Sequence, residues 1–209
     1  MSRRSILIAT SNPGKLRDFS GVASAFGVTI AGIPGFSSLP KVVEDGTTFE
    51  ANARKKAEAY SQAVPGELIL ADDSGLEIDA LRGAPGVHSA RYAAEDPNGA
   101  ECNTDDHANN ARVLRELANV PPQKRTARFV CVLAAARDGR TVQTFQGTAE
   151  GIVLAAPRGT DGFGYDPLFY VPPISKTFAE LNAQEKASYS HRGAAFRAFL
   201  EWYRETGPR

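Results

Sequence analysis

A short apolar run leads through a small polar turn into an amphipathic segment near the start of the chain, where residues 6–16 read ILIATSNPGKL. Residues 5–9 are typical of a buried strand. From Lys15 onward the apolar side chains recur at helical spacing, and Gly27 follows as a helix C-cap; these side chains are Leu16, Phe19, Ala23 and Phe26. A strand followed by a tight turn and a helix predicts an α/β architecture.

Strand-like and helix-like segments continue to alternate beyond this start. A second helix is predicted before Pro65 by apolar residues three or four positions apart, namely Phe49, Ala53, Ala57, Tyr60 and Val64. We expect a short buried strand at residues 68–71 that two aspartates break, a long loop at 82–102 and a helix at 104–118. A last helix is predicted by Phe196, Phe199, Leu200 and Tyr203.

The middle of the chain changes to a β pattern. Residues 126–137 and 141–155 are β-rich runs on either side of Asp138 and Gly139, and an Asp-Gly pair between such runs is a strong hairpin signal. The whole pattern predicts a mixed α/β fold with a central β-sheet and flanking helices, divided into two lobes around a cleft. We expect residues 1–209 to form a single domain.

The composition excludes several classes of protein. Lys and Arg number 24, as do Asp and Glu, so the net charge is zero and the basic excess of duplex-binding proteins is absent. The apolar share of 42% is that of a globular chain, and no apolar run approaches the ~20 residues of a membrane helix. The start does not resemble a signal peptide; Cys102 and Cys131 lie far apart, and Cys131 fits a buried thiol. These features predict a soluble cytoplasmic protein with no disulfide framework and no nucleic-acid or membrane partner.

The first candidate site is the turn after the first strand, which consists of Thr10, Ser11, Asn12, Pro13, Gly14 and Lys15. A helix N-terminus offers backbone N–H groups and the positive end of the helix dipole, which suit a phosphate, and Lys15 adds a full charge. The turn is not a P-loop, because that motif needs Gly in place of Ala9 and Ser or Thr in place of Leu16. The alternative is a plain helix start capped by Ser11 or Asn12.

The second candidate site is a pair of adjacent carboxylates, Asp72 and Asp73, followed by Ser74. Neighbouring side chains of a strand point to opposite faces, and such carboxylates rarely serve packing. Mg²⁺ takes one or two protein carboxylates together with substrate phosphates. A second ligand would come from an acid upstream: Glu44, Asp45 or Glu50. The alternative is an Asx turn with solvated carboxylates.

Two further segments combine polar and aromatic side chains. Residues 162–167 read GFGYDP, and aromatics between glycines suit a platform on which a base stacks. The alternative there is a tight turn with buried aromatics. Lys186 and the corner Ser190-His191-Arg192 precede the last helix, and their alternative role is a helix start with surface charge.

Five motifs occur in an order that matches one known family. They are residues 10–15, residues 72–76, Gly83-Ala84-Pro85-Gly86 with Ser89-Ala90-Arg91-Tyr92, residues 159–167, and Ser190-His191-Arg192-Gly193. Together they resemble the inosine triphosphate pyrophosphatase family, the Ham1-like nucleoside triphosphate pyrophosphohydrolases, over almost the whole chain. The resemblance implies a two-lobed α/β homodimer with an active-site cleft. It also implies Mg²⁺-dependent cleavage, with Mn²⁺ as a substitute, of ITP, dITP and XTP to the monophosphate and pyrophosphate.

The resemblance assigns a role to each matching position. It implies that residues 10–15 cradle the phosphates, with Asn12 and Lys15 as side-chain contacts. Asp73 would be the proton acceptor and, with Glu44, a metal ligand, while Ser74 would touch the substrate. The implied base and sugar pocket consists of Phe163, Gly164, Tyr165, Asp166, Lys186, His191 and Arg192.

One position departs from the family pattern, which commonly has Thr-Phe-x-Glu-Asn-Ala where this chain has Thr48-Phe49-Glu50-Ala51-Asn52-Ala53. Ala51 lacks the acid, and Glu50 lies roughly 100° away around a helix, so a supporting carboxylate would have to come from Asp45. Two other functions stay open: a nucleotide-sensing binding module, and a pyrophosphatase for modified pyrimidine nucleotides. The acids Asp73 and Glu44 argue against a pure binder, which needs no carboxylate to activate water.

Overall fold

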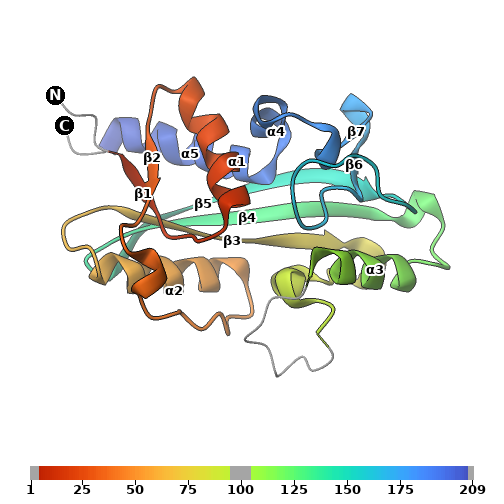
Figure 1. Cartoon of the computed structure of the whole chain (residues 1–209), viewed down its shortest axis with the longest axis horizontal. Helices are drawn as coiled ribbons and strands as arrows, with labels where there is room; N and C mark the ends of the chain where they lie inside the picture. The colour runs from red at the N-terminus through yellow and green to blue at the C-terminus, as the bar shows by residue number, and fades with distance from the viewer. Residues whose placement is uncertain (1–4, 95–104, 207–209) are drawn as a thin grey trace. The chain divides into compact units, whose positions relative to one another are not determined.

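The computed structural model describes residues 5–94 and 105–206. Its strands form a mixed sheet in the order β2-β1-β3-β4-β5-β6-β7 with flanking helices (Figure 1), which confirms the predicted fold class. By their contacts the residues fall into two compact units. Unit 1 consists of Met1–Asp73, Cys131–Thr148 and Ala183–Arg209, and unit 2 of Ser74–Val130 and Ala149–Asn182. That the chain acts as a single domain stays a prediction.

Unit 1 begins with parallel strands. β1 (Ile6–Ile8) pairs in parallel with β2 (Ile30–Gly32) on one side and with β3 (Ile69–Ile78) on the other. Three helices pack against one another on one side of these strands, and α2 (Phe49–Gln62) lies on the opposite side (Figure 1). The three are α1 (Pro13–Ala25), α4 (Ala183–Tyr189) and α5 (His191–Thr206).

The apolar core of unit 1 lies where α1 and α5 meet. The rings of Phe19 and Phe196 are both fully buried, with centroids 5.3 Å apart. Full burial of one such side chain contributes about 1.5–3 kcal/mol to folding. This packing fixes the positions from which the two helices present their polar first turns.

Unit 2 has its own aromatic core. Phe129 and Phe169 have ring centroids 4.7 Å apart, and Phe178 stacks on Phe129 at 5.7 Å. Its other elements include α3 (Asp106–Glu116), β6 (Phe169–Val171) and β7 (Lys176–Thr177), and the last two pair antiparallel. Short 3₁₀ helices occur at Phe36–Ser38, Asp79–Leu81, Gly86–Arg91, Pro122–Lys124, Pro172–Ile174 and Phe178–Glu180.

Several predicted elements are confirmed. β4 (Thr126–Arg137) and β5 (Arg140–Val153) are neighbours in the sheet, and only Asp138 and Gly139 separate them, as the hairpin signal predicts. Both turn residues have positive φ, which a tight hairpin turn of this kind requires. The predicted second, third and last helices correspond to α2, α3 and α5.

One predicted strand is wrong in its extent. Residues 68–71 were expected to form a strand that Asp72 and Asp73 break, yet β3 continues through both aspartates to Ile78. β1 ends at Ile8, opposite Leu70, whereas β3 remains next to β4 in the sheet. The strand therefore has a backbone partner beyond the end of β1, and both carboxylates have charged partners of their own.

Three points concern other parts of the chain. The loop predicted at 82–102 contains a 3₁₀ helix at Gly86–Arg91, and its last part, with Cys102, lies outside the described residues.

Cys131 is a buried free thiol as predicted, and burial raises its pKa. Among the described helices, none combines the length and the apolar character needed to cross a membrane.

Candidate active site

The turn between β1 and α1 is a capped helix start. Asn12 is the N-cap: its Oδ1 accepts hydrogen bonds from the backbone N–H groups of Gly14 at 2.8 Å and Lys15 at 3.3 Å. Pro13 stands at the first helical position, where it lacks an N–H that would need a partner. The capping alternative is thus confirmed for Asn12. The backbone N–H groups of Gly14 and Lys15, which were candidates for binding a phosphate, are hydrogen-bonded to this cap. Phosphate binding at the turn stays a prediction.

Lys15 reaches across from α1 to Asp72 on β3. Its Nζ lies 3.0 Å from Asp72 Oδ2 and 3.1 Å from Oδ1, and Nε of Arg192 lies 3.5 Å from the same Oδ2. Burial alone would raise the pKa of Asp72. The positive charges of Lys15 and Arg192 outweigh burial and hold this pKa well below its usual value. Asp72 is therefore an ionised counter-ion at neutral pH, and it orients Lys15 at the N-terminus of α1.

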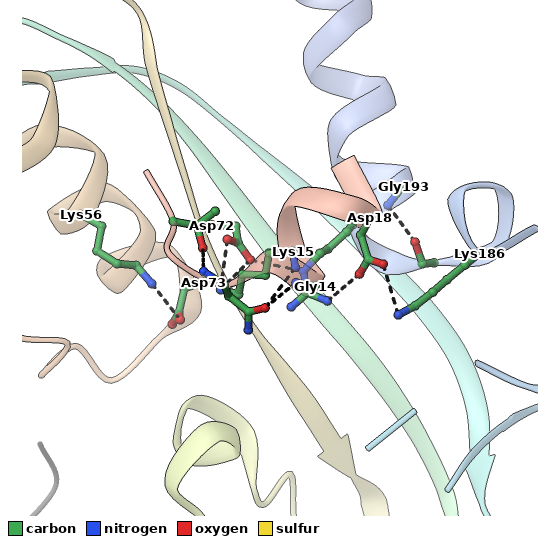
Figure 2. Close-up of polar contacts among 12 residues, drawn as sticks. Gly14, Lys15, Asp18, Lys56, Asp72, Asp73, Lys186 and Gly193 are labelled. Carbon is green, nitrogen blue, oxygen red and sulfur yellow. Dashed lines mark hydrogen bonds and ion pairs between the residues drawn. The ribbon is translucent and has the colours of Figure 1, made fainter. Parts of the chain in front are cut away.

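Asp73 points to the other side of β3 and meets α2. Asn52 Nδ2 donates to Asp73 Oδ2 at 3.1 Å, and Lys56 Nζ lies 3.3 Å from Asp73 Oδ1. Asn52 and Lys56 are one helical turn apart, so they lie on the same face of α2. Figure 2 shows Lys15 and Lys56 extending to the two neighbouring aspartates from two different helices.

Lys56 also binds Glu44 and so joins it to Asp73. The distance from Lys56 Nζ to Glu44 Oε2 is 2.6 Å, and Lys56 itself is buried. Burial would raise the pKa of Glu44, but Lys56 lowers it further than burial raises it. The pKa of Asp73, in contrast, is raised, chiefly by burial and also by the charge of Glu44, against the opposing effect of Lys56. The two neighbouring acids of β3 therefore differ: the pKa of Asp72 is lowered, whereas that of Asp73 is raised.

The donor set of Glu44 and Asp73 fits a divalent metal that completes its shell with substrate. Two carboxylates converge on one cation, and Mg²⁺ uses one or two protein carboxylates with phosphates and water. Within the described ranges, no group of three or more His, Cys, Asp or Glu residues is placed to hold a metal. Asp45 does not join the pair, because its exposed carboxylate binds Lys55 at 2.6 Å.

The corner at the start of α5 is buried and is joined to α1 by ion pairs. Asp18 bridges two cations: its Oδ1 lies 3.3 Å from Lys186 Nζ, and its Oδ2 lies 3.3 Å from Arg192 Nη1 (Figure 2). Lys186 and Arg192 are buried, so the surface-charge alternative is wrong. Burial, followed by the charges of Arg192 and Lys186, lowers the pKa of His191 well below its usual value. The imidazole of His191 is therefore neutral at pH 7.

A glycine on β5 permits this corner to form. A Cβ atom at Gly147 would lie 2.1 Å from the carbonyl oxygen of His191 and 2.4 Å from the backbone nitrogen of Ala195. No side chain fits at those distances without moving the backbone of α5. The first turn of α5 can approach β5 only because position 147 has no side chain.

The aromatic loop belongs to unit 2 and is held from within. Asp166 Oδ2 accepts a hydrogen bond from the Phe163 N–H at 2.8 Å, and the Tyr165 hydroxyl donates to the carbonyl of Ser89 at 2.7 Å. Tyr165 and Asp166 are buried in a tight turn, as the alternative interpretation of this segment expects, and a role of the loop in binding a base stays a prediction. Phe163 and Gly164 are half-buried, as is Ser74 on β3.

The predicted site residues thus fall into two groups. Unit 1 brings together Lys15, Glu44, Asp72, Asp73, Lys186, His191 and Arg192, and unit 2 contains Ser74 and residues 163–166. Sequence reasoning missed Asp18, Asn52 and Lys56. Their spacing offered a signal, because Asp18 lies one turn after Lys15, and Asn52 and Lys56 interrupt the apolar face that Phe49 and Ala53 define.

Fold and site together define the class of protein. This is a mixed α/β chain whose ionic cluster lies where β1 ends, and open α/β sheets bind their ligands outside the carboxyl ends of parallel strands. A sequence model described as the Ham1 family matches residues 6–202. The chain belongs to the Ham1 family.

Individual relatives resemble the chain over nearly its whole length. A dITP/XTP pyrophosphatase of Geobacillus kaustophilus is 48% identical over 97% of this chain and 95% of its own, and one of Desulforamulus reducens is 47% identical over 94% of both. Among solved structures, a HAM1 protein from Coxiella burnetii matches with TM-score 0.81 and 36% identity, covering 97% of this chain and 99% of its own. The Staphylococcus aureus Ham1 protein matches with TM-score 0.77 and 41% identity over 95% and 99%.

Proposed function

We propose that this chain hydrolyses deaminated purine nucleoside triphosphates, such as ITP, dITP and XTP, to the monophosphate and pyrophosphate. The observation that carries the proposal is the pair of acids on β3, which are adjacent in sequence yet chemically opposite. Asp72 is ionised between Lys15 and Arg192, and Asp73 has a raised pKa beside Lys56 and Glu44. The relatives from Geobacillus and Desulforamulus are named dITP/XTP pyrophosphatases, which supports the same substrate class.

In this proposal the first acid organises the phosphate site. Lys15 is held by Asp72 at the N-terminus of α1, where the helix dipole adds a partial positive charge. A triphosphate that approaches this terminus meets a cation already directed by its counter-ion. The turn from Thr10 to Gly14 would contribute polar contacts to the phosphates. Asn12 would do so either with its side-chain NH₂ group or after its Oδ1 releases the backbone N–H groups that it now caps.

The second acid would carry the proton transfer. Asp73 takes a proton from the attacking water, whose oxygen bonds to the α-phosphorus while the bond from that phosphorus to the leaving pyrophosphate oxygen breaks. A carboxylate with a raised pKa is the better proton acceptor near neutral pH. Asn52 fixes one oxygen of Asp73 and leaves the carboxylate in a defined orientation.

Glu44 and Asp73 would hold the divalent metal, Mg²⁺ or Mn²⁺. The bound ion supplies positive charge to the phosphate oxygens. Lys56 Nζ lies between the two carboxylates, so the ion and this ammonium would share the same oxygens.

Selectivity for a keto base requires hydrogen-bond donors that meet the oxygen where adenine has an amino group. A site built on such donors can reject the wrong base by ~10⁴–10⁵. We propose Lys186, His191 and Arg192, with Phe163, Gly164, Tyr165 and Asp166, as the base and sugar pocket. We also propose a cytoplasmic homodimer that removes these nucleotides from the pool that polymerases use.

A substrate panel tests the proposed function. Pyrophosphate and phosphate are measured separately after incubation with ITP, dITP, XTP, GTP, ATP and UTP, with Mg²⁺ and with excess EDTA. We expect pyrophosphate from the first three, little turnover of ATP, and none in EDTA. Asp73→Asn is the matched control, because it removes the proton acceptor and excludes a contaminating enzyme. Binding of ITP with no product would favour the nucleotide-sensing module. Preferential turnover of a pyrimidine nucleotide would favour a pyrophosphatase for modified pyrimidine nucleotides.

A further inference from the structure

Two side chains of α3 bind the aromatic loop of unit 2 through the backbone N–H and the backbone carbonyl of a single residue, Gly164. The backbone N–H of Gly164 donates to Asp106 Oδ2 at 2.6 Å, and the carbonyl of Gly164 accepts from Asn110 Nδ2 at 2.9 Å. Asp106 and Asn110 are four residues apart, so they project from the same face of the helix. We propose that Asp106 and Asn110 are positioning residues that set base selectivity by fixing the loop at 162–166. This inference rests on the proposed function.

Gly164 is the residue at which such a clamp has most effect. Its φ is +62°, a left-handed conformation that residues with a side chain rarely adopt. The donor and the acceptor of one residue are fixed together, and the direction of the chain through that residue is therefore fixed as well. Phe163 immediately precedes it, so the clamp determines where the Phe163 ring is presented.

The rest of the loop transmits this position. The N–H of Phe163 bonds to the Asp166 carboxylate at 2.8 Å, and the N–H of Asp166 bonds to the carbonyl of Phe163 at 3.3 Å. The loop from Phe163 to Asp166 is thus one closed turn, and it moves as a unit. A change at Gly164 displaces both the aromatic ring and the buried carboxylate.

The helix that bears the clamp is itself anchored. Val113 and Leu117 are fully buried in the core of unit 2, and Asn109 Oδ1 accepts from the N–H of Ala93 at 2.8 Å. The Arg112 guanidinium stacks over the Tyr92 ring at 4.2 Å from its centroid. α3 is consequently a rigid support, and its two polar side chains can impose a position on the loop rather than follow it.

A base pocket discriminates by hydrogen bonds whose geometry must hold to a fraction of an ångström. Misplacement by about 1 Å can cost roughly 10²-fold in rate. The misplaced loop should lose the preferred base most, because ITP gains from the aligned contacts and ATP does not. The expected signature is therefore a change in the ratio of kcat/KM for ITP to that for ATP, and not a uniform loss.

Four variants test the clamp. Asn110→Asp replaces the donor facing the Gly164 carbonyl with an acceptor of the same size, and Asp106→Ala removes the acceptor for the Gly164 N–H. Asp106→Asn is the conservative variant, because its amide oxygen can still accept that bond. Asp105→Ala is the control for a lost charge at the start of α3, since Asp105 is the exposed N-cap whose side chain makes no cap bond.

We expect Asn110→Asp and Asp106→Ala to lower the ITP-to-ATP ratio of kcat/KM by roughly tenfold or more, while Asp106→Asn and Asp105→Ala keep the wild-type ratio. Melting curves accompany each measurement, and Asn110→Asp decides the result if Asp106→Ala does not fold. An unchanged ratio in folded variants, or equal losses for both substrates, overturns the clamp and leaves the proposed function intact. Failure of the wild-type protein to release pyrophosphate from ITP overturns the proposed function, and the clamp with it.

Discussion

Replacing Lys56 by methionine tests the charge arrangement of unit 1 most directly. The change keeps an unbranched chain as far as Cε but removes the ammonium, whose Nζ lies 2.6 Å from Glu44 Oε2 and 3.3 Å from Asp73 Oδ1. Lys56 remains charged in the fold because the two acids raise its pKa more than burial lowers it. The variant leaves two neighbouring carboxylates without the cation between them.

The expected loss of stability follows from the burial of this group. Removing one partner of a buried ion pair costs about 3–5 kcal/mol. We expect the lower end, about 3 kcal/mol, because the Glu44 side chain is 36% exposed and water screens it. For a chain of this length, that loss corresponds to a fall in Tm of about 6–12 °C.

The loss should depend on pH with a definite sign. The pKa of Asp73 is raised in the folded state, and removal of Lys56 raises it further. A carboxyl whose pKa is higher in the folded than in the unfolded chain destabilises the fold only above its unfolded-state pKa, about 3.9. The loss of stability therefore grows as the pH rises from the unfolded-state pKa to the folded-state pKa of Asp73, and it is smallest in acid.

Thermal melts at about pH 5 and about pH 8 measure this dependence. The control is Lys55→Met, which removes the adjacent lysine, 44% exposed, from its ion pair with the exposed Asp45 and should leave Tm nearly unchanged. Mg²⁺ at about 100 times its Kd should return about 2.7 kcal/mol to Lys56→Met if it binds only the folded chain. Equal small losses for the two lysines, or a larger loss at the lower pH, would refute the assigned role of Lys56.

Three further substitutions test the proposed chemistry. Asp73→Asn should lower kcat by ~10²–10⁴ while ITP still binds, since a general base contributes that much; retention of more than about a tenth of the wild-type kcat contradicts the assignment. Lys15→Ala should weaken binding of ITP but hardly that of inosine, because its ammonium is placed for phosphate; calorimetry that finds equal losses argues against this role. Arg192→Ala should lower kcat/KM for ITP more than for ATP and also lower Tm, because it strips Asp18 and Asp72 of a buried partner. An unchanged ITP-to-ATP ratio would move base selection away from Arg192.

The parts of the fold that sequence reasoning predicts are those with a local cause. The hairpin at Asp138 and Gly139 and the capped start of α1 each depend on residues next to one another in the chain. The continuation of β3 through its aspartates does not, because the ion pair that neutralises Asp72 comes from Lys15, 57 positions earlier. β2, β6 and β7, with two or three residues each, are too short to show a period.

The candidate site divides in the same way. The motifs point to Lys15 and to the pair Asp72 and Asp73 as candidates, and the family resemblance singles out Asp73 from that pair. They did not identify Lys56 or Asp18, whose roles arise from what the folded chain brings beside them. Each looks like an ordinary charged residue of an amphipathic helix until its face of the helix is known.

Gly147 has a consequence for how substitutions in this protein are classified. It lies on a strand, carries no functional group, and in a mutational library would be grouped with tolerant small-residue positions. Even alanine, however, would place a methyl group 2.1 Å from the carbonyl oxygen of His191 and force the first turn of α5 outward. A substitution at 147 should therefore behave genetically like the loss of His191 and Arg192 together, although it removes neither side chain.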